Sequence, residues 1–265
     1  MHPIFDVKVS KKSAAVHWFG QSSYAFKGAS GELVLIDPYF PRVRPPERFI
    51  HPEPPVDEAE IPAALVLLTH DHRDHTCIET LGRVRKASPG ARYVGPVESV
   101  RHIADAGVPA EETIVIQAGE SLTVGSVVVH AVYAKPPEGD PEAGINPPDV
   151  THLGYVVDLD GIRLYFTGDP INTFARRDDL IEPVRALKPD VGFFTTHPTE
   201  GEFPFFDGSR EMARKIGVRK AVPAHYQCFV KRNYDPAAWA EGFGPGDPEP
   251  LIIGYNQMVV LEAGA

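Results

Sequence analysis

The chain has few cysteines and no long apolar segment, and these absences exclude several classes of protein. Its 265 residues include only two cysteines, Cys77 and Cys228, which are too few to staple a secreted fold, so we expect free thiols in a reducing cytoplasm. No apolar run approaches the roughly 18–20 residues that a membrane helix needs. The N-terminal segment lacks the basic-then-apolar order of a signal peptide. We therefore expect a cytoplasmic protein that does not enter a membrane.

An excess of positive charge is also missing. The formal net charge is −10 at pH 7, which argues against binding a long polyanion such as a nucleic acid. A small anionic substrate is still compatible with this charge, because a site can be locally basic on an acidic protein. We therefore expect a small-molecule substrate and no nucleic-acid partner.

The patterning predicts alternating strands and helices with short connections. The 27 prolines and 23 glycines indicate many tight turns, and two stretches, 38–62 and 135–151, read as long loops. Without a repeat or a convincing linker, one α/β domain over residues 1–265 is the economical interpretation. Expected strands lie at 15–20, 22–27, 32–37, 63–69, 92–95, 121–134 (a hairpin), 152–169 (a pair), 190–196, 220–225 and 256–262, and expected helices at 77–87, 96–107, 209–217 and 236–243.

The stretch LLTHDHRDH carries the strongest chemical signal. It follows the apolar run AALVLLT, which predicts a buried strand. His70 and His72 lie two residues apart at the end of this extended segment, so their side chains can point the same way. Asp74 and His75 follow as the chain turns into the next helix. Imidazole and carboxylate groups are ligands for zinc and similar divalent metals, so the spacing H-x-H-x-D-H predicts a metal site.

Three more residues are candidates for the same edge of the fold. Asp169 follows a strand and a glycine in YFTGDP, where it is either a ligand or a turn residue. His225 ends the strand-like run KAVPA, and a ligand role is favoured over a buried core histidine. Asp37 in LIDPYF either supports the site or caps the turn before Pro38, with the turn role slightly favoured.

The segments GQSSYAF, LIDPYF, THDHRDH, YFTGDP and PAHYQCF resemble the metallo-β-lactamase superfamily. Within it, the chain resembles the L-ascorbate 6-phosphate lactonase-like branch and its metal-dependent hydrolase relatives, from about Val16 to Leu261. The resemblance implies a four-layer αββα sandwich with the metals at one edge. It also implies that His70 and His72 bind a first metal, that Asp74, His75 and His225 bind a second, and that Asp169 bridges the two.

The chain departs from this pattern at the third ligand of the first metal. The relatives carry a histidine where AVYAKPPEG places Lys135. His152 and His197 are nearly equal candidates to replace it, and His130 ranks behind them because we expect a core position for it. Lys135 itself can instead bind an anionic substrate.

The ligand set predicts a metal-dependent hydrolase. A bound metal lowers the pKa of a water to roughly 7. The metal-bound hydroxide then attacks an electrophilic centre, either the carbon of a carbonyl group or the phosphorus of a phosphoryl group. We expect Asp74 and Asp169 to orient the water and move its proton. The resemblance suggests a small ester or lactone substrate, phosphorylated substrates included, with Lys135, Lys231 and Arg232 as substrate-binding residues. Zinc or manganese is expected, with one or two ions per chain, and iron fits the same ligands.

Two alternatives stay open. A mononuclear iron-dependent oxidoreductase on the same fold would keep this motif, whereas flavin-partnered di-iron proteins use H-x-E-x-D-H, and His72 in the glutamate position speaks against them. A degenerate scaffold without catalysis is favoured only by Lys135. The proline-rich loop and the resemblance are both compatible with a homo-oligomer.

Overall fold

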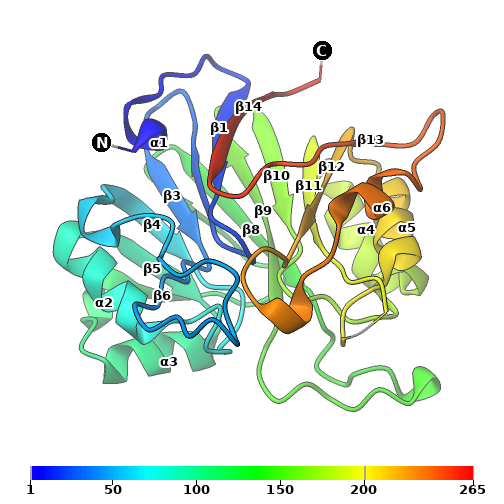
Figure 1. Cartoon of the computed structure of the whole chain (residues 1–265), viewed down its shortest axis with the longest axis horizontal. Helices are drawn as coiled ribbons and strands as arrows, with labels where there is room; N and C mark the ends of the chain where they lie inside the picture. The colour runs from blue at the N-terminus through cyan, green and yellow to red at the C-terminus, as the bar shows by residue number, and fades with distance from the viewer. Residues whose placement is uncertain (1, 200, 265) are drawn as a thin grey trace.

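Two seven-stranded sheets lie face to face, with helices on both outer sides (Figure 1). The computed structural model describes residues 2–199 and 201–264. The helices α1 to α3 cover one sheet and α4 to α6 cover the other, which gives four layers. The predicted αββα sandwich is therefore confirmed.

The first sheet combines the N-terminal strands with the last strand of the chain. Its order is β14-β1-β2-β3-β4-β5-β6, antiparallel from β14 to β3 and parallel from β3 to β6. The strands are β1 (Ser13–Trp18), β2 (Tyr24–Lys27), β3 (Leu33–Ile36), β4 (Ala63–Leu67), β5 (Arg92–Gly95), β6 (Thr113–Val115) and β14 (Gln257–Glu262), and the helices on this side are α1 (Pro3–Asp6), α2 (Ile78–Ala87) and α3 (Val97–Asp105).

The second sheet has the order β13-β12-β11-β10-β9-β8-β7, parallel from β13 to β10 and antiparallel from β10 to β7. No helix among the residues described is long and apolar enough to span a membrane. The strands are β7 (Ser121–Val124), β8 (Val127–Tyr133), β9 (Leu153–Leu159), β10 (Ile162–Phe166), β11 (Val191–Thr195), β12 (Lys220–Ala224) and β13 (Glu249–Pro250), and the helices are α4 (Asp178–Ala186), α5 (Phe206–Ile216) and α6 (Pro236–Ala240).

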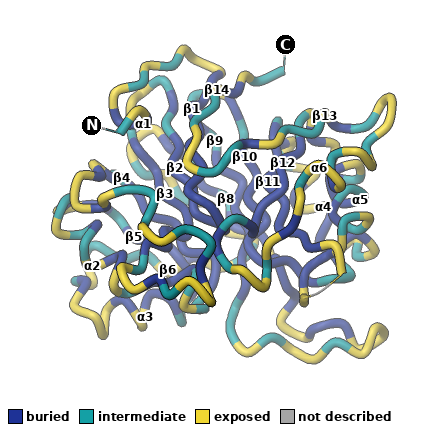
Figure 2. The backbone as a smooth tube through the Cα atoms, viewed as in Figure 1, coloured by how far each residue is buried: buried dark blue, intermediate teal, exposed yellow. Residues whose placement is uncertain are grey.

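The main core lies between the sheets. Alternate residues of each strand face it, for example Ala14, Val16 and Trp18 of β1. The residues between them face the helices, so that every residue of β1 is buried. Figure 2 shows this pattern for the whole molecule, with buried strands in the centre and exposed residues on the helices and loops.

The structure contains four helices and strands that the sequence patterning did not predict: α1, β6, α4 and β13. Helix α4 carries Pro183 in its interior, which removes a backbone donor and disfavours a helix prediction there. Burial of Leu180, Ile181 and Val184 against the second sheet compensates for it. Helix α5 begins at Phe206, three residues before the predicted start. Short 3₁₀ turns occupy Glu58–Glu60, Ala110–Glu112, Pro141–Ala143, Phe174–Arg176 and Val230–Arg232.

The strand directions bring distant loops to one edge. The parallel strands β3 and β4 of the first sheet end there, as do β10 and β12 of the second. Because β9 runs antiparallel to β10, its first residue lies at the same edge as the last residues of β10. The topology therefore gathers the loops that follow Ile36, Leu67, Phe166 and Ala224, together with the one that precedes Leu153.

Candidate metal centre

The motif after β4 folds into a tight turn that is held by its own backbone. The amides of His75 and Thr76 donate to the carbonyl of His72 at 2.9 and 2.7 Å, and the Thr76 hydroxyl donates to the carbonyl of His70 at 2.8 Å. His70 and His75 are fully buried, whereas His72 is partly exposed. The turn thus presents its ligand-type side chains on one side before α2 begins.

The structure brings together seven of the eight residues predicted to bind metal. Their ligand atoms form three sets, and within each set all atoms lie within 4.8 Å of one another. The first group is His70, His72 and His152; the second group is Asp74, His75 and His225; a third set, His70, His75 and Asp169, connects the two. His197 belongs to none of these sets, so of the two nearly equal candidates it is His152 that joins the first group.

Strand register explains the position of His152. It directly precedes β9, and its carbonyl accepts the amide of Ala134 at 3.0 Å, across from the end of β8. Lys135 therefore lies beside His152, and its Nζ contacts Glu202 Oε2 at 2.5 Å. Burial and the positive charge of Lys135 together lower the pKa of His152 to about 3. The lysine thus lies next to the first group and is already paired with a carboxylate.

Asp169 is positioned by the glycine before it. Gly168 has a φ of +58°, and a Cβ at this position would lie 2.4 Å from the carbonyl oxygen of Leu153. Only glycine allows this close approach. The turn directs the Asp169 carboxylate at both groups: its Oδ2 lies 3.9 Å from His70 Nε2 in the first group and 3.5 Å from His75 Nε2 in the second.

Several buried polar atoms of the site have no hydrogen-bond partner among the described residues. They are His70 Nε2, both ring nitrogens of His152, and Asp169 Oδ1. Leaving such atoms unpaired is costly unless another group satisfies them. Burial lowers the pKa values of His70 and His225, so their rings are neutral and offer a lone pair. Nitrogen lone pairs around a carboxylate fit a divalent cation.

His75 is held from both sides by carboxylates. Burial by itself would lower its pKa, but Asp169, Asp37 and Asp74 outweigh that effect and raise it well above the usual value. Asp37 Oδ2 lies 2.8 Å from His75 Nδ1, and Asp37 also accepts the Thr69 amide and hydroxyl. The slightly favoured turn role of Asp37 was therefore wrong: it orients His75, so that Nε2 faces the other residues of the second group.

His72 has a carboxylate partner that the sequence analysis missed. Its Nε2 lies 3.1 Å from Asp149 Oδ2, and the Asp149 side chain is 72% exposed. Asp149 comes from the loop between β8 and β9, 77 residues away in sequence. No local motif connects the two residues, so only the folded chain shows the contact.

A cleft of about 300 Å³ opens beside these residues. Arg232 lines it, and Arg232 Nη1 has no hydrogen-bond partner among the described residues. Lys231 is exposed and does not line this cleft, so the structure separates the two residues that were predicted together. The full lining is His72, Asp74, Asp169, Glu202, Phe203, His225, Phe229 and Arg232.

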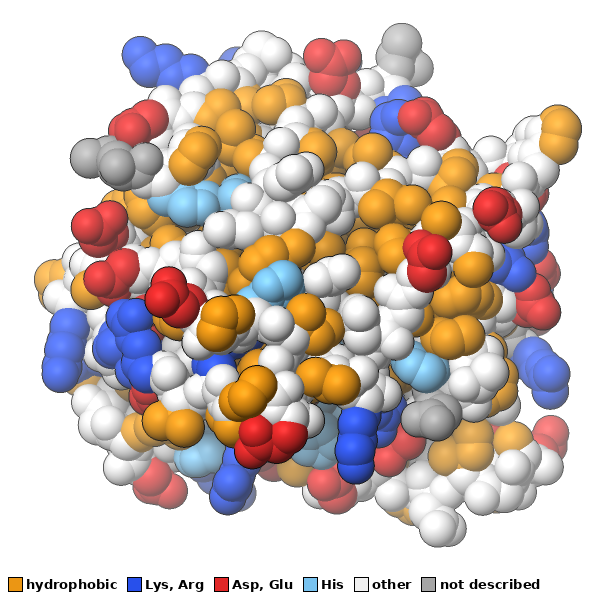
Figure 3. Space-filling view, in the orientation of Figure 1, with side chains coloured by type: hydrophobic (Ala, Val, Ile, Leu, Met, Phe, Trp, Pro, Cys, Tyr) orange, Lys and Arg blue, Asp and Glu red, His pale blue; other side chains and the backbone are white. Residues whose placement is uncertain are grey.

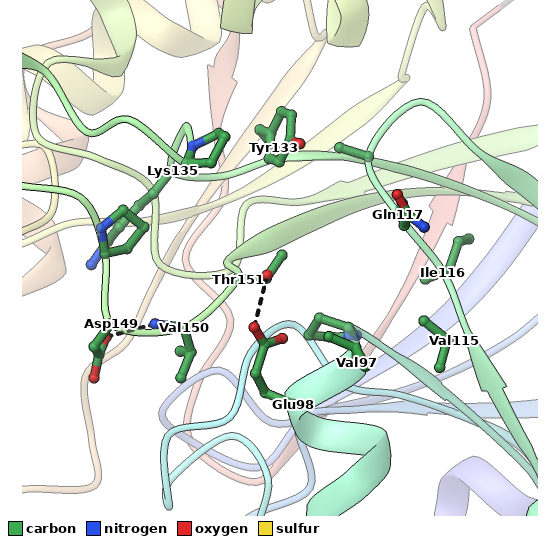
Figure 4. A pocket seen from close by; sticks show the side chains of 14 residues that line it. Val97, Glu98, Val115, Ile116, Gln117, Tyr133, Lys135, Asp149, Val150 and Thr151 are labelled. Carbon is green, nitrogen blue, oxygen red and sulfur yellow. Dashed lines mark hydrogen bonds between the residues drawn. The ribbon is translucent and has the colours of Figure 1, made fainter.

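A neighbouring cavity of about 500 Å³ contains none of the residues of the three sets. Lys135 and Asp149 lie on the same side of it, and the Thr151 hydroxyl donates to Glu98 at 3.1 Å (Figure 4). Lys135 therefore borders this cavity rather than the cleft that Arg232 lines. Over the face seen in Figure 3, acidic and basic side chains are interspersed, without an extended basic patch on that face of the described chain.

Three other predictions concern residues near the site. His130 lies on the outer face of β8, where it is partly exposed and contacts the Ser121 hydroxyl at 2.6 Å, so the expected core position was wrong. Cys77 and Cys228 are free and buried, and both pack in a small apolar cluster. Neither belongs to any of the three sets.

Gln21 was not predicted as a site residue, although it lies in GQSSYAF. Its Nε2 donates to Asp74 Oδ2 at 2.7 Å and lies 2.9 Å from His225 Nε2. Gln21, Asp37, His225 and Gln227 all have positive φ angles, an uncommon conformation for non-glycine residues. Because glutamine is a rare metal ligand, the pattern of residue types contained no signal for this contact.

The beta-lactamase superfamily domain model matches residues 32–226. The chain therefore belongs to the metallo-β-lactamase superfamily, as the motif predicted. The matched region includes every residue of the three sets but not Gln21.

Two relatives are UPF0173 metal-dependent hydrolases. The one from Myxococcus xanthus is 27% identical over 84% of this chain and 74% of the relative. That from Thermococcus kodakarensis is 28% identical over 94% and 96%. The solved structure of Igni18, a metallo hydrolase from Ignicoccus hospitalis, superimposes with a TM-score of 0.70 and 17% identity, over 95% of this chain and all of that one. This last similarity concerns the fold.

Proposed function

We propose that the chain is a metal-dependent hydrolase that cleaves small esters or lactones bearing an anionic group, phosphate included. The histidine and carboxylate cluster carries the proposal, because its buried atoms lack partners among the described residues and it borders an open cleft. In this proposal the first group binds one divalent cation, the second group binds another, and Asp169 faces both. The similarity to metal-dependent hydrolases supports the hydrolase part of the proposal.

A divalent cation bound here would supply a water of lowered pKa, roughly 7, and would polarise the scissile bond. The protein residues would position this water and accept its proton. Asp74 is the better candidate for the proton, because its side chain is 25% exposed and lines the cleft. Asp169 is almost completely buried, and its Oδ1 can accept a hydrogen bond from the water.

Arg232 supports an anionic substrate. Its guanidinium lies over the Phe203 ring at 5.5 Å, which fixes its orientation at the cleft. A planar guanidinium can bind carboxylate or phosphate oxygens through two parallel hydrogen bonds. The preference for lactones, and for phosphorylated lactones in particular, rests on the resemblance to the ascorbate 6-phosphate lactonase-like branch.

The experiment is a hydrolysis assay on the zinc- or manganese-loaded chain with paired lactones and phenyl esters, each with and without a phosphate. We expect turnover that stops with a chelator and returns with added metal. Arg232→Ala should raise KM for the anionic member of a pair by about tenfold, the value of a hydrogen bond to a charged group, and leave the neutral member unchanged. Lys231→Ala is the matched control and should leave KM unchanged for both members of a pair. Absence of metal-dependent turnover on every pair would contradict the proposal.

One observation favours a second candidate, mononuclear iron-dependent oxygen chemistry. His70, His75 and Asp169 form a set of two histidines and one carboxylate, the donor combination used by non-haem iron oxygenases. Iron content of the purified chain, together with oxygen uptake in the presence of candidate substrates, separates this candidate from the hydrolase. A chain that binds no metal at all would instead be the non-catalytic scaffold.

A further inference from the structure

The side chain of Gln21 lies inside the second group. Its Nε2 is 2.7 Å from Asp74 Oδ2, 2.9 Å from His225 Nε2 and 3.5 Å from His75 Nε2. These three partners are the members of the second group. A primary amide carries two N–H donors, so it can satisfy the Asp74 carboxylate and the His225 lone pair at the same time. The amide nitrogen thus uses the same acceptor atoms that a cation would use.

The orientation of this amide is determined by its neighbours. Asp74 accepts hydrogen bonds only, so the amide nitrogen must face it, and the Ser22 backbone N–H donates to Gln21 Oε1. A flipped amide would place its oxygen against the Asp74 carboxylate, where both atoms are acceptors, and its nitrogen against the Ser22 N–H, where both are donors. The oxygen is therefore directed away from the second group, and Gln21 meets that group as a donor.

The backbone holds Gln21 in this position. Its amide donates to the Tyr226 carbonyl at 2.8 Å, and its carbonyl accepts from the His225 amide at 3.1 Å and from Trp18 Nε1 at 3.0 Å. The residue is buried, with an exposed fraction of 1%, and its φ is +55°. The turn that carries Gln21 is thus tied to the turn that carries His225. Burial restricts the rotamers that the Gln21 side chain can adopt, whereas an exposed side chain would have many. The fold therefore holds the amide against the second group.

The first group differs in this respect, because the carboxylate that contacts it is exposed: His72 Nε2 lies 3.1 Å from Asp149, whose side chain is 72% exposed. His70 Nε2 and both nitrogens of His152 lack hydrogen-bond partners among the described residues. A cation at the first group gains these atoms without displacing a hydrogen bond from them. A cation at the second group must first displace the Gln21 amide from Asp74 and His225, and breaking a hydrogen bond to a charged group has a cost.

We propose that the carboxamide of Gln21 competes with a metal ion for Asp74 and His225, so that the chain binds one divalent cation tightly and a second more weakly. This inference rests on the proposed function, because it assumes that the second group binds a cation. It assigns Gln21 a positioning role that sets the metal stoichiometry of the site.

The test is an equilibrium titration of the chelator-treated full chain with Zn²⁺ in competition with a chromophoric zinc indicator. His152→Ala, which removes a member of the first group, assigns the two binding steps. In Gln21→Ala we expect the second zinc to bind at least about tenfold more tightly, the minimum value of the displaced charged hydrogen bond. The first dissociation constant should stay within about twofold of wild type. A second constant that is unchanged would overturn the inference, and a weaker one would identify Gln21 as a ligand and overturn it as well.

Gln21→Leu removes the competing donor without adding a charge or a metal-binding group, so it tests the inference if the alanine variant does not fold. It should also tighten the second step by at least about tenfold, since it removes the same hydrogen bond. Gln227→Ala is the matched control, because Gln227 is also a glutamine with positive φ but contacts His51 at 3.1 Å. It should change neither constant.

The two proposals fail in distinguishable ways. If the wild-type chain binds no zinc, both the proposed function and the proposed competition by Gln21 are overturned. Wild-type chain that binds two zinc ions, with the second constant unaltered in both Gln21 variants, would overturn the competition and leave the proposed function intact.

Discussion

The first and second groups lie at the same edge of the molecule but differ in what their donor atoms contact. In the first group, His70 Nε2 and both ring nitrogens of His152 lack partners among the described residues. In the second, Asp74 and His225 are bonded to Gln21, and His75 is held by Asp37. Two similar sets of side chains can thus differ in how much they gain from a cation, because that gain is measured against the hydrogen bonds already present.

The largest expected effect is the loss of the first position in His152→Ala. Removing a direct donor should raise the first zinc dissociation constant by more than about a hundredfold, which exceeds the loss of metal affinity expected when a supporting partner is removed. Metal content per purified chain should fall from about two towards one. His197→Ala is the control, because His197 belongs to none of the three sets. Equal losses in both variants would contradict the choice of His152.

The second position should depend on Asp37 nearly as strongly. Asp37→Asn replaces the buried carboxylate that orients His75 and accepts from Thr69. Loss of such a supporting partner typically costs about 10–100-fold in metal affinity. We expect the second zinc constant to weaken by this amount while the first changes far less. Titration with the zinc indicator measures both, and a uniform change in the two constants would mean that Asp37 does not distinguish the groups.

Gly168→Ala should weaken both positions together, because it displaces the carboxylate that faces both. A Cβ would lie 2.4 Å from the Leu153 carbonyl oxygen at a φ of +58°. We expect both zinc constants to weaken by about tenfold and the free energy of unfolding to fall by about 2 kcal/mol. The control is Gly82→Ala in α2, where a Cβ meets nothing within 4 Å. It should raise the free energy of unfolding by about 0.5–1 kcal/mol. Denaturant unfolding measures both free energies. Equal changes in Gly168→Ala and Gly82→Ala would contradict the role assigned to Gly168.

The smallest effect is expected for Asp149→Asn. Asp149 contacts His72 at 3.1 Å, much as Asp37 contacts His75 at 2.8 Å. The Asp149 side chain is 72% exposed and that of Asp37 is 1% exposed, so solvent screens the first contact. The first zinc constant should therefore weaken by less than about threefold. A change as large as that in Asp37→Asn would show that burial does not govern these supporting contacts.

The motif and the strand ends were visible in the sequence because they depend on local order. His70, His72, Asp74 and His75 follow one strand directly, and their spacing alone indicated a metal site. Asp169 and His225 each follow a strand that apolar runs identify. Helix α4 was missed because Pro183 disfavours a helix in the sequence pattern, and packing against the second sheet is what stabilises it.

Contacts between distant loops were not visible, because they depend on strand register and loop path. His152 and His197 looked equivalent as histidines next to strands, and antiparallel pairing of β8 and β9 separated them. Lys231 and Arg232 looked equivalent as neighbouring cations, but the cleft is lined by only one of them. Asp149 and Gln21 come from turns far from the motif and have residue types that indicate no particular role.

The sequence by itself determined the alternation of strands and helices and the turn that carries the metal-binding motif, because apolar periodicity and short-range spacing act over a few residues. The superfamily and the sandwich of two covered sheets followed from the resemblance of its motifs to the metallo-β-lactamase superfamily. Only the tertiary structure decided which histidine completes the first group and which side chain enters the second. Those choices depend on how strands of the two sheets end beside one another, and on which buried donor atoms the folded chain satisfies from within.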